Sequence, residues 1–583
     1  MTFAPRLAVT LVALWLAAQP ALARPSHANP AHGRPSSAAV YAEGMVSAAD
    51  PRAAEAGAAM LRAGGNATDA ALATMFALTV VEPQSSGIGG GGFLVHGTAA
   101  GRVETIDGRE SALAAAGPDW WLANGQPVPF AQAQRGGKSV GVPGAVALAA
   151  AAHRKFGKLP WARLFAPAIA LARGGFIVTP RFNRALTVAR GTGALDPAAR
   201  RMFYTSSGDP VAVGTRVRNP ALAAFLTRLA RQGAPAFYAG ANRAALVRAV
   251  TTTPHNPAPL TLADVAAYAA HPREPLCGAY RQWRICGMGP PSSGATTVYA
   301  ILKQLERFDL TALGPHSPTA WHLIAESMRL TYADRDRYVG DPGFVSVPAT
   351  GLMDPAYLAA RSALIDPART LGLVSAGIPP GAQTLSRAAQ PAGEEHGTSH
   401  FVAIDRRGGV VSYTNTIESA FGSGLMVNGY FLNNELTDFD FVPARDGRPA
   451  ANAVAGRKRP RSSMAPTLVY DAAGRLRLAV GAAGGSTIPA QVAKTIIGVL
   501  DWRLSAQAAI ALPVLFAPGD AVFVEAGSAL EPLIPALQAL GHQDVRPREM
   551  PLKANAIEAT GQGMRTQLSG AADPRSEGAA VTE

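Results

Sequence analysis

The chain changes character near residue 398, and this change limits what it can fold into. Residues 45–340 are dominated by Ala-rich amphipathic helices separated by Gly- and Pro-rich turns. From Thr398 the pattern alternates instead. Thr398–Asp405 has the pattern of one strand, an Arg-Arg-Gly-Gly turn follows, and Val410–Ile417 has the pattern of a second strand. This predicts an antiparallel β-hairpin. The fold must therefore combine many helices with at least one sheet that takes strands from the C-terminal part of the chain.

The clearest helical periodicities share an apolar stripe and a Pro, Asn or Gly near the start. They predict helices at Pro51–Ala63, Asn66–Val81, Ala145–Phe156, Pro160–Arg173, Pro220–Gln232 and Thr319–Tyr338. A second hairpin is expected at Thr467–Tyr470 and Leu476–Val480. A helix from about Pro489 to Trp502 follows a glycine turn, and the sequence contains no repeats.

The distribution of charge argues against a nucleic-acid partner. The formal net charge is +13 over 583 residues, which by itself would suit an acidic ligand. From Thr398 to the end, however, there are 17 basic and 17 acidic residues, so the whole excess lies earlier. It consists mostly of Arg scattered along helices, without a basic block interleaved with aromatics. We interpret it as a solvated surface, and a nucleic-acid binder is the weakest hypothesis.

The first 23 residues have the pattern of a Sec signal peptide. Arg6 precedes an apolar run from Leu7 to Ala18, and Ala21-Leu22-Ala23 forms a small-residue cleavage pattern. The apolar run is short for a membrane span, and no later segment has 18 apolar residues in a row. We expect cleavage near Ala23 and a periplasmic or secreted protein without a membrane anchor.

Export permits disulfides, and the chain has two cysteines. Cys277 and Cys286 bracket a short segment that suits a tight hairpin or an extended loop. The spacing favours a local structural disulfide between them, although free thiols are compatible with the same spacing.

Two generic site patterns can be set aside. Gly87–Gly92 is glycine-rich but lacks the following Lys-Ser/Thr of a phosphate loop. His396 and His400 have a spacing that suits zinc on a helix, but His400 falls in the alternating strand and no HExxH motif occurs. Neither pattern predicts a ligand site.

Thr398, at the change from helical to alternating sequence, is a candidate nucleophile. A Thr hydroxyl needs a neighbouring base, and a Thr that begins a chain can use its own α-amine, whose unperturbed pKa is about 8. Such a chain start requires a cut after Gly397, which the same hydroxyl could make by attacking the preceding carbonyl. The hairpin register places Thr416 opposite Thr398 to within one residue, where it could hydrogen-bond the amine or the hydroxyl.

The stretches around Thr398 and throughout the chain resemble the γ-glutamyltransferase (γ-glutamyltranspeptidase) family of N-terminal-nucleophile hydrolases, from about Glu43 to Arg575. Those before Thr398 are AGGNATDAALA (63–73), EPQSSGIGGGGF (82–93), DGRES (107–111), GVPG (141–144), PPSSG (290–294) and ADRDRYVGDP (333–342). The others are GTSHFVAID (397–405), NTIESAFGSG (415–424), LNNELTDFD (432–440), RPRSSMAPT (459–467), AAGGS (482–486) and AADPR (571–575). So many motifs in the same order make a chance match untenable.

The resemblance implies an α+β fold, a four-layer αββα sandwich in which two subunits intertwine. It also implies a precursor that cuts itself between Gly397 and Thr398, giving a large subunit of residues 24–397 and a small subunit of residues 398–583 that remain together as a heterodimer. Thr398 would attack the γ-glutamyl amide of a glutathione-like donor, and water or an acceptor amine would release the acyl group. No metal or organic cofactor is implied.

The resemblance also assigns roles at the site, and each suits a zwitterionic glutamyl group. Arg109 would bind the α-carboxylate, which Ser462 and Ser463 would also hydrogen-bond. The α-ammonium would face acidic positions, and the backbone N–H groups of a glycine pair would form the oxyanion hole. The acidic residues are Glu418, Glu435 and Asp438, and the glycine pair is Gly484 and Gly485.

Two departures from the family pattern bear on specificity. The glycine loop has Ala483 where the family commonly has Pro before the glycines, and Thr487 where it commonly has Arg after the Ser. Residues 442–461, which correspond to the substrate lid of lidded members, contain no aromatic residue. We therefore expect an exposed glutamyl pocket. An acylase of the same fold acting on glutaryl-type amides, and a non-enzymatic periplasmic binding protein, are the alternative hypotheses.

Overall fold

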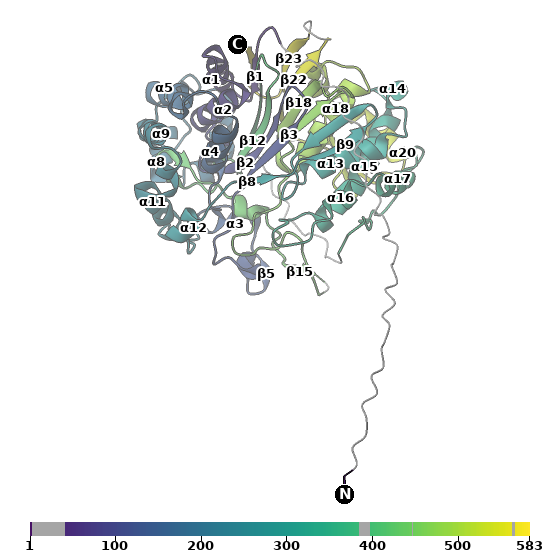
Figure 1. Ribbon diagram of the computed structural model, residues 1–583, viewed down its shortest axis with the longest axis horizontal. Coiled ribbons are helices and arrows are strands. Elements are labelled where there is room, and N and C mark those ends of the chain that lie inside the picture. Colours follow the sequence, from purple (N-terminus) through teal and green to yellow (C-terminus); the bar gives the residue numbers. More distant parts are fainter. Residues whose placement is uncertain (3–40, 384–396, 446, 562–565) are drawn as a thin grey trace.

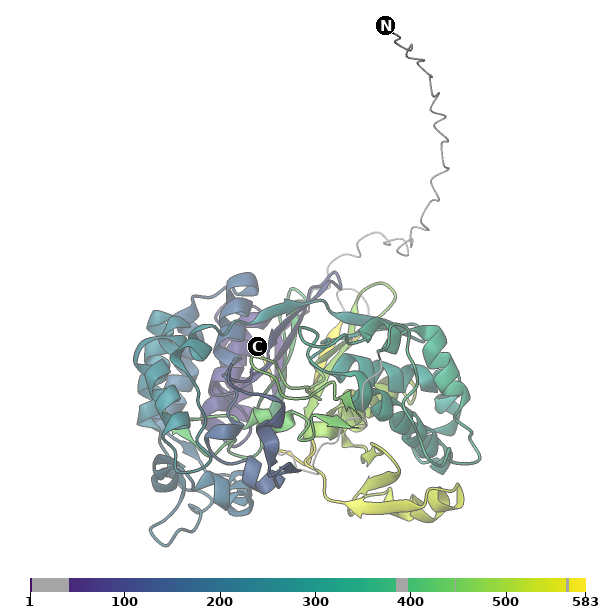
Figure 2. The same ribbon diagram turned by 90° about the horizontal axis from the view of Figure 1, so that it is seen from below.

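The computed structural model describes residues 1–2, 41–383, 397–445, 447–561 and 566–583. The signal-peptide segment and His396 therefore lie outside the described residues, apart from Met1 and Thr2. Two sheets stack face to face, with one layer of helices on either side (Figures 1 and 2). The expected four-layer α+β sandwich is confirmed.

The seven-stranded sheet mixes strands from before and after residue 397. Its order is β24 (Ala579–Thr582), β1 (Met45–Ala48), β11 (Gly397–Ile404), β12 (Val410–Glu418), β2 (Gly91–Gly97), β3 (Val103–Gly108) and β8 (His271–Arg273). The six-stranded sheet has the order β23 (Gln567–Ala572), β22 (Lys553–Thr560), β18 (Leu476–Ala483), β17 (Thr467–Tyr470), β10 (Trp283–Gly287) and β9 (Leu276–Tyr280). Both expected hairpins are confirmed, β11–β12 and β17–β18.

Strand β11 is buried on both faces, because it lies between two hydrophobic cores. Phe401 and Ala403 join the core beneath the N-terminal helices, whereas Val402 and Ile404 join the core of the six-stranded sheet and its helices. This alternation follows from the two-residue period of a strand. It places Thr398 on the face that looks toward the other sheet.

The helical layers also separate along the sequence (Figure 1). The seven-stranded sheet is covered by α1 (Pro51–Arg62), α2 (Ala67–Val81) and α4 (Ala145–Phe156). Farther out, α5 (Ala166–Gly174) packs on α2 and α9 (Pro220–Gln232) packs on α5. The six-stranded sheet is covered by α13 (Gly294–Leu305), α15 (Pro318–Tyr338) and α18 (Ile488–Leu500). Within the described residues, no helix combines the length and apolar character that crossing a bilayer requires.

Local signals explain most helix boundaries. Asn66 caps α2 through a capping box with Asp69, and Asp50 caps α1 ahead of Pro51. The expectation of one helix over residues 160–173 is wrong. A 3₁₀ turn at Trp161–Phe165 comes first, and α5 begins at Ala166. Pro167 lacks the N–H that would bond the carbonyl four residues earlier, so the α-helix restarts there.

The two cysteines lie directly opposite each other on the hairpin β9–β10 and form a disulfide. Their hairpin is at the edge of the six-stranded sheet. The pairing therefore fastens a two-stranded edge unit rather than joining distant parts of the chain.

Gly481 on β18 packs directly against the His400 ring of β11, which comes from the other sheet. A Cβ built at Gly481 would lie 2.4 Å from Cε1 of His400, and that ring is fully buried. We expect Gly481→Ala to lower the free energy of unfolding by about 1–3 kcal/mol through overpacking. Thermal unfolding measures this. Gly117→Ala is the matched control, since no atom lies within 4 Å of its added Cβ. Equal melting temperatures for both variants would contradict the prediction.

Candidate active site

The hairpin β11–β12 brings the two expected threonines together. Thr398 pairs with Thr416 in the strand register, and their Oγ1 atoms are 2.9 Å apart. Thr416 Oγ1 also lies 2.6 Å from the carbonyl oxygen of Gly397 and accepts a hydrogen bond of 2.8 Å from the N–H of Glu418. The register inferred from the turn is confirmed.

These contacts fix the direction of the hydroxyl protons. The carbonyl of Gly397 can only accept, so Thr416 must donate its single hydroxyl proton there. Thr398 must then be the donor to Thr416 Oγ1. The carbonyl before Thr398 is thus polarised by a hydrogen bond, while the proton of Thr398 points toward an oxygen that can receive it.

A buried polar network holds the opposite face of β11. Ser399 donates to Glu82 at the end of α2 over 2.6 Å, and Lys553 of β22 forms an ion pair of 3.0 Å with the same carboxylate. Burial lowers the pKa of Lys553 to about 8. These contacts join α2, β11 and β22 directly behind Thr398.

Arg109, just after β3, is fully buried at the floor of the site. Its guanidinium forms ion pairs with Glu435 and Asp438. It also donates to the carbonyls of Pro460 and Arg461 over 3.2 and 2.9 Å. The sequence analysis assigned this cation and these acids to different ends of a substrate. In the structure they contact each other, because buried charges require partners.

Glu110, which the sequence analysis did not single out, adds another carboxylate beside Arg109. Its Oε2 lies 3.9 Å from the guanidinium. Burial raises the pKa of Glu110 to about 7, while Arg109 opposes that shift. Burial also raises the pKa of Glu435 well above its ordinary value. The floor of the site can therefore hold a proton near neutral pH.

Ser462 and Ser463 are positioned by the segment 290–294 and by α15. The N–H and Oγ of Ser293 each donate to the carbonyl of Ser462 over 2.8 Å. Arg335 of α15 donates to Ser293 Oγ over 2.9 Å and to Ser463 Oγ over 2.6 Å. Since Ser463 accepts from Arg335, its own hydroxyl proton is left to donate elsewhere. Arg335 was not among the predicted site residues, although it lies in the family-like stretch 333–342.

The glycine loop between β18 and α18 is held from behind. Thr487 donates to the carbonyl of Gly484 over 2.7 Å, and Tyr332 of α15 donates to the carbonyl of Ser486 over 2.5 Å. Gly484 has φ +124°, and an added Cβ would lie 2.4 Å from the carbonyl oxygen of Pro551. Glycine is therefore required there, and side-chain hydrogen bonds fix the loop without the family's Pro and Arg.

One small pocket collects most of the predicted site residues, with about 240 Å³ of empty space that includes its opening to solvent. Its lining comprises Arg109, Thr398, Thr416, Glu418, Glu435, Asp438, Ser462, Ser463, Met464, Gly485 and Ile488. Met464 and Ile488 give one apolar wall that the sequence analysis did not foresee. Gly397 lies next to this pocket through its bond to Thr416, and Gly484 through Gly485.

The segment that corresponds to a lid, residues 442–461, reaches the site only through the carbonyls of Pro460 and Arg461 that accept from Arg109. Among its described residues, Ala444–Arg445 and Arg448–Pro449 form a short exposed hairpin, β15–β16, and none of 442–461 lines the pocket. This arrangement is compatible with a pocket open to bulky donors, which stays a prediction.

His400 is buried, with Nδ1 2.8 Å from Thr414 Oγ1, and burial lowers its pKa to about 3.

Comparison with known proteins places this site in a family. A family model described as gamma-glutamyltranspeptidase matches residues 53–583. The chain belongs to the gamma-glutamyltranspeptidase family. A glutathione hydrolase proenzyme of Bacillus subtilis (strain 168) is 36% identical over 510 residues, covering 86% of this chain and 85% of the relative.

The chain also resembles proteins that are named for a different activity. An acylase ACY 1 proenzyme of Pseudomonas sp. (strain SE83) is 35% identical over 546 residues, covering 92% of this chain and 93% of the relative. The structure of a cephalosporin acylase from Bacillus halodurans superposes with a TM-score of 0.80 at 26% identity, covering 96% of this chain and 99% of that one. Helicobacter pylori gamma-glutamyltranspeptidase gives a TM-score of 0.53 at 34% identity over 59% of this chain and 94% of that one. The family is therefore shown, and the substrate within it must be argued from the pocket.

Arg335 is expected to act as a positioning residue for Ser463. Arg335→Lys keeps the charge but cannot reach both Ser293 and Ser463 in one plane. We expect KM for a γ-glutamyl anilide to rise about 3- to 10-fold with a smaller change in kcat, corresponding to one lost hydrogen bond. Arg337→Lys, on the same helix, is the control. A kcat loss at unchanged KM would contradict this role.

Glu110 should make stability depend on pH. Its pKa of about 7 in the folded protein exceeds the ordinary value of 4.5, so the folded state holds the proton more tightly than the unfolded state between these values. The folded state therefore loses stability as pH rises through this window. Glu110→Gln removes that loss, so its melting temperature relative to wild type should be higher at about pH 8 than at about pH 5. A difference that does not change with pH would refute the assignment.

Proposed function

We propose that the chain is an exported, self-processing γ-glutamyl hydrolase/transferase in which Thr398 is the nucleophile. The observation that carries the proposal is the hydrogen-bonded set formed by Thr398, Thr416 and the carbonyl of Gly397, at the mouth of a pocket with one Arg and several carboxylates. The family membership supports the same chemistry. Export rests on the expected signal peptide.

Self-processing would begin with attack of Thr398 Oγ1 on the carbonyl carbon of Gly397. The C–N bond breaks, the acyl group moves to the oxygen as an ester, and the Thr398 nitrogen becomes an amine. Water then hydrolyses the ester, which leaves a carboxylate on Gly397 and a free hydroxyl on Thr398. Thr416, which donates to the attacked carbonyl over 2.6 Å, would stabilise the developing negative charge.

Turnover would repeat the chemistry on a γ-glutamyl amide. The freed α-amine of Thr398 would accept the hydroxyl proton as Oγ1 attacks the amide carbonyl, and the same proton would pass to the departing amine. The N–H groups of Gly484 and Gly485 would hold the oxyanion. Water or an acceptor amine would then attack the acyl-enzyme ester and restore Thr398.

The pocket suits a glutamyl group better than a plain carboxylate. Arg109 and the hydroxyl of Ser463 would bind the α-carboxylate, while Glu418, Glu435 and Asp438 would bind the α-ammonium. These carboxylates outnumber the one guanidinium in the lining, so the pocket attracts a positive charge. A glutaryl group lacks the ammonium and would leave them without a substrate partner.

Acylase activity on glutaryl-type amides is the second candidate. It is favoured by the cephalosporin acylase neighbour and by the ACY 1 relatives, which cover nearly the whole chain. It needs Arg109 and Thr398 but not the acidic cluster. The two activities can therefore be separated by their dependence on that cluster.

Thr398→Ala should abolish both the cut and turnover. Wild-type protein should run on denaturing gels as two fragments, and sequencing of the smaller one should start at Thr398. Thr398→Ala should remain a single chain because it lacks the attacking oxygen. Thr416→Ser, which keeps the hydroxyl, is the control and should still process. An intact wild-type chain that hydrolyses a γ-glutamyl anilide would overturn the mechanism.

Asp438→Asn should distinguish glutamyl from glutaryl substrates. Loss of a charged partner for the ammonium should lower kcat/KM for a γ-glutamyl anilide about tenfold or more. The value for a glutaryl anilide should stay the same or rise. Arg109→Lys should lower both values, since both substrates carry the carboxylate. Equal losses on both substrates in Asp438→Asn would reject ammonium recognition by this residue.

A further inference from the structure

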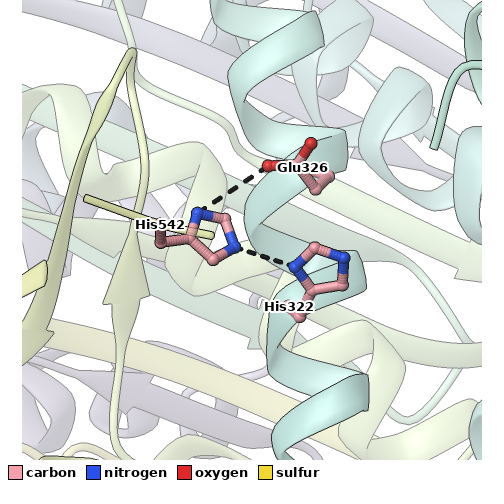
Figure 3. A group of neighbouring side chains, drawn as sticks. All are labelled: His322, Glu326 and His542. Carbon is pink, nitrogen blue, oxygen red and sulfur yellow. Dashed lines mark hydrogen bonds and ion pairs between the residues drawn. The ribbon is translucent and has the colours of Figure 1, made fainter. Parts of the chain in front are cut away.

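A second cluster of titratable side chains lies outside the active-site pocket. His322 and Glu326 are four residues apart on α15, and His542 approaches them from the turn between α20 (Ile534–Ala539) and β21 (Asp544–Arg548) (Figure 3). All three side chains are buried, with exposures of 0, 0 and 2%. None belongs to the active-site lining, and the family resemblance gave them no task.

Hydrogen bonds fix which nitrogen of each ring carries a proton. Nε2 of His322 lies 2.8 Å from the carbonyl oxygen of Asp366, which can only accept, so Nε2 holds the hydrogen. With both rings neutral, Nδ1 of His322 then presents a lone pair. Nε2 of His542, at 2.8 Å, must donate to it (Figure 3). The lone pair of His542 is left on Nδ1.

That lone pair faces a carboxylate. Nδ1 of His542 is 3.8 Å from Oε1 of Glu326, which is too far for a hydrogen bond. The lone pair of a buried nitrogen therefore faces a buried carboxylate oxygen. Oε1 of Glu326 already accepts from Arg329 and Thr370, so the atom that an added cation would engage first is Nδ1 of His542.

The charged groups around Glu326 do not already neutralise the cluster, so a cation would be favoured there. Arg329 donates to Glu326 over 2.6 Å and pairs with Asp520 over 3.0 Å, so the three together carry one net negative charge. Thr370 donates to Oε1 of Glu326 and the N–H of Leu371 to Oε2, over 2.9 and 2.8 Å. Hydrogen bonds of this kind orient a carboxylate, and the carbonyl of Asp366 orients His322, as outer partners do in metal sites.

We propose that His322, Glu326 and His542 form a structural site for one divalent transition-metal ion of the Zn²⁺ class. Each residue offers one donor atom, and the three donor atoms lie within 4.8 Å of one another. Tetrahedral Zn²⁺ with imidazole and carboxylate ligands needs donor atoms about 3.3 Å apart, so small side-chain rotations suffice. The ion would bind Nδ1 of His322 and Nδ1 of His542, so the rings turn and give up the hydrogen bond between them while Nε2 of His542 keeps its proton, and a water completes four-coordination.

The position of the site indicates a structural role. His322 and Glu326 lie in the first half of α15, whereas Tyr332 and Arg335 of its second half contact Ser486 and Ser463. From Glu326 to Arg335 the helix rises by about 13 Å. The ion would fasten α15 to the turn before β21, and so support residues that shape the active site without touching a substrate.

Metal content and thermal stability of tag-free, full-length protein test the site. After treatment with a chelator, the protein is given Zn²⁺ alone, desalted and analysed by mass spectrometry for zinc. We expect one zinc per chain and a rise in Tm of at least about 2 °C over the chelated form. His542→Gln keeps a donor toward His322 but removes the ring, and should lose both effects. His316→Gln, at an exposed histidine just before α15, should keep both.

Cobalt provides a readout that does not depend on a variant folding. Wild-type protein loaded with Co²⁺ should show the visible absorption of a tetrahedral nitrogen–oxygen site, and added Zn²⁺ should remove it. Retention of one zinc per chain by His542→Gln would overturn the proposal. So would equal melting temperatures of the chelated and zinc-treated wild type. Neither readout requires γ-glutamyl activity, so the site and the proposed function can fail separately.

Discussion

The rest of the site depends on the hydrogen bond that the hydroxyl of Thr416 donates to the carbonyl of Gly397. This hydroxyl donates its one hydrogen bond to the carbonyl of Gly397, so the hydroxyl of Thr398 must donate to Thr416 Oγ1. This arrangement exists only in one register of β11 against β12, and a slip of one residue would turn Thr398 toward the helices. The central position of both strands, with β1 on one side and β2 on the other, fixes that register.

Around this pair the structure concentrates charge that water would otherwise solvate. Arg109 contacts two carboxylates directly and a third at 3.9 Å, and burial shifts the pKa of Glu110 and of Glu435 upward. Preorganised charge of this kind needs no rearrangement when a charged ligand arrives. Helix α15 adds to this charge, because the guanidinium of Arg335 donates to Ser463 from outside the pocket lining.

The sequence predicted features with a local cause, and it missed those that depend on distant side chains. Strand alternation and a four-residue turn predict the pairing of Thr398 with Thr416 to within one residue, and apolar periodicity predicts α1 and α2 to within one residue at each end. Apolar spacing alone does not reveal the break before α5, because it carries no information about the N–H that Pro167 lacks. The contact between Arg109 and Glu435 joins residues 326 positions apart, and that between His322 and His542 residues 220 apart. No periodicity encodes such contacts. The roles assigned to the site residues came from the resemblance and stay predictions.

The strand order of the large sheet has a consequence for any cut at residue 397. Strands β24, β11 and β12 come from one side of that point and β1, β2, β3 and β8 from the other, yet β1 lies between β24 and β11. Two fragments made there would share one sheet, in which strands of each fragment form hydrogen bonds with strands of the other. They could separate only by unravelling the sheet. If the proposed cut occurs, it would follow folding of the single chain, because the interlaced strands assemble more readily within one chain than from two separate pieces.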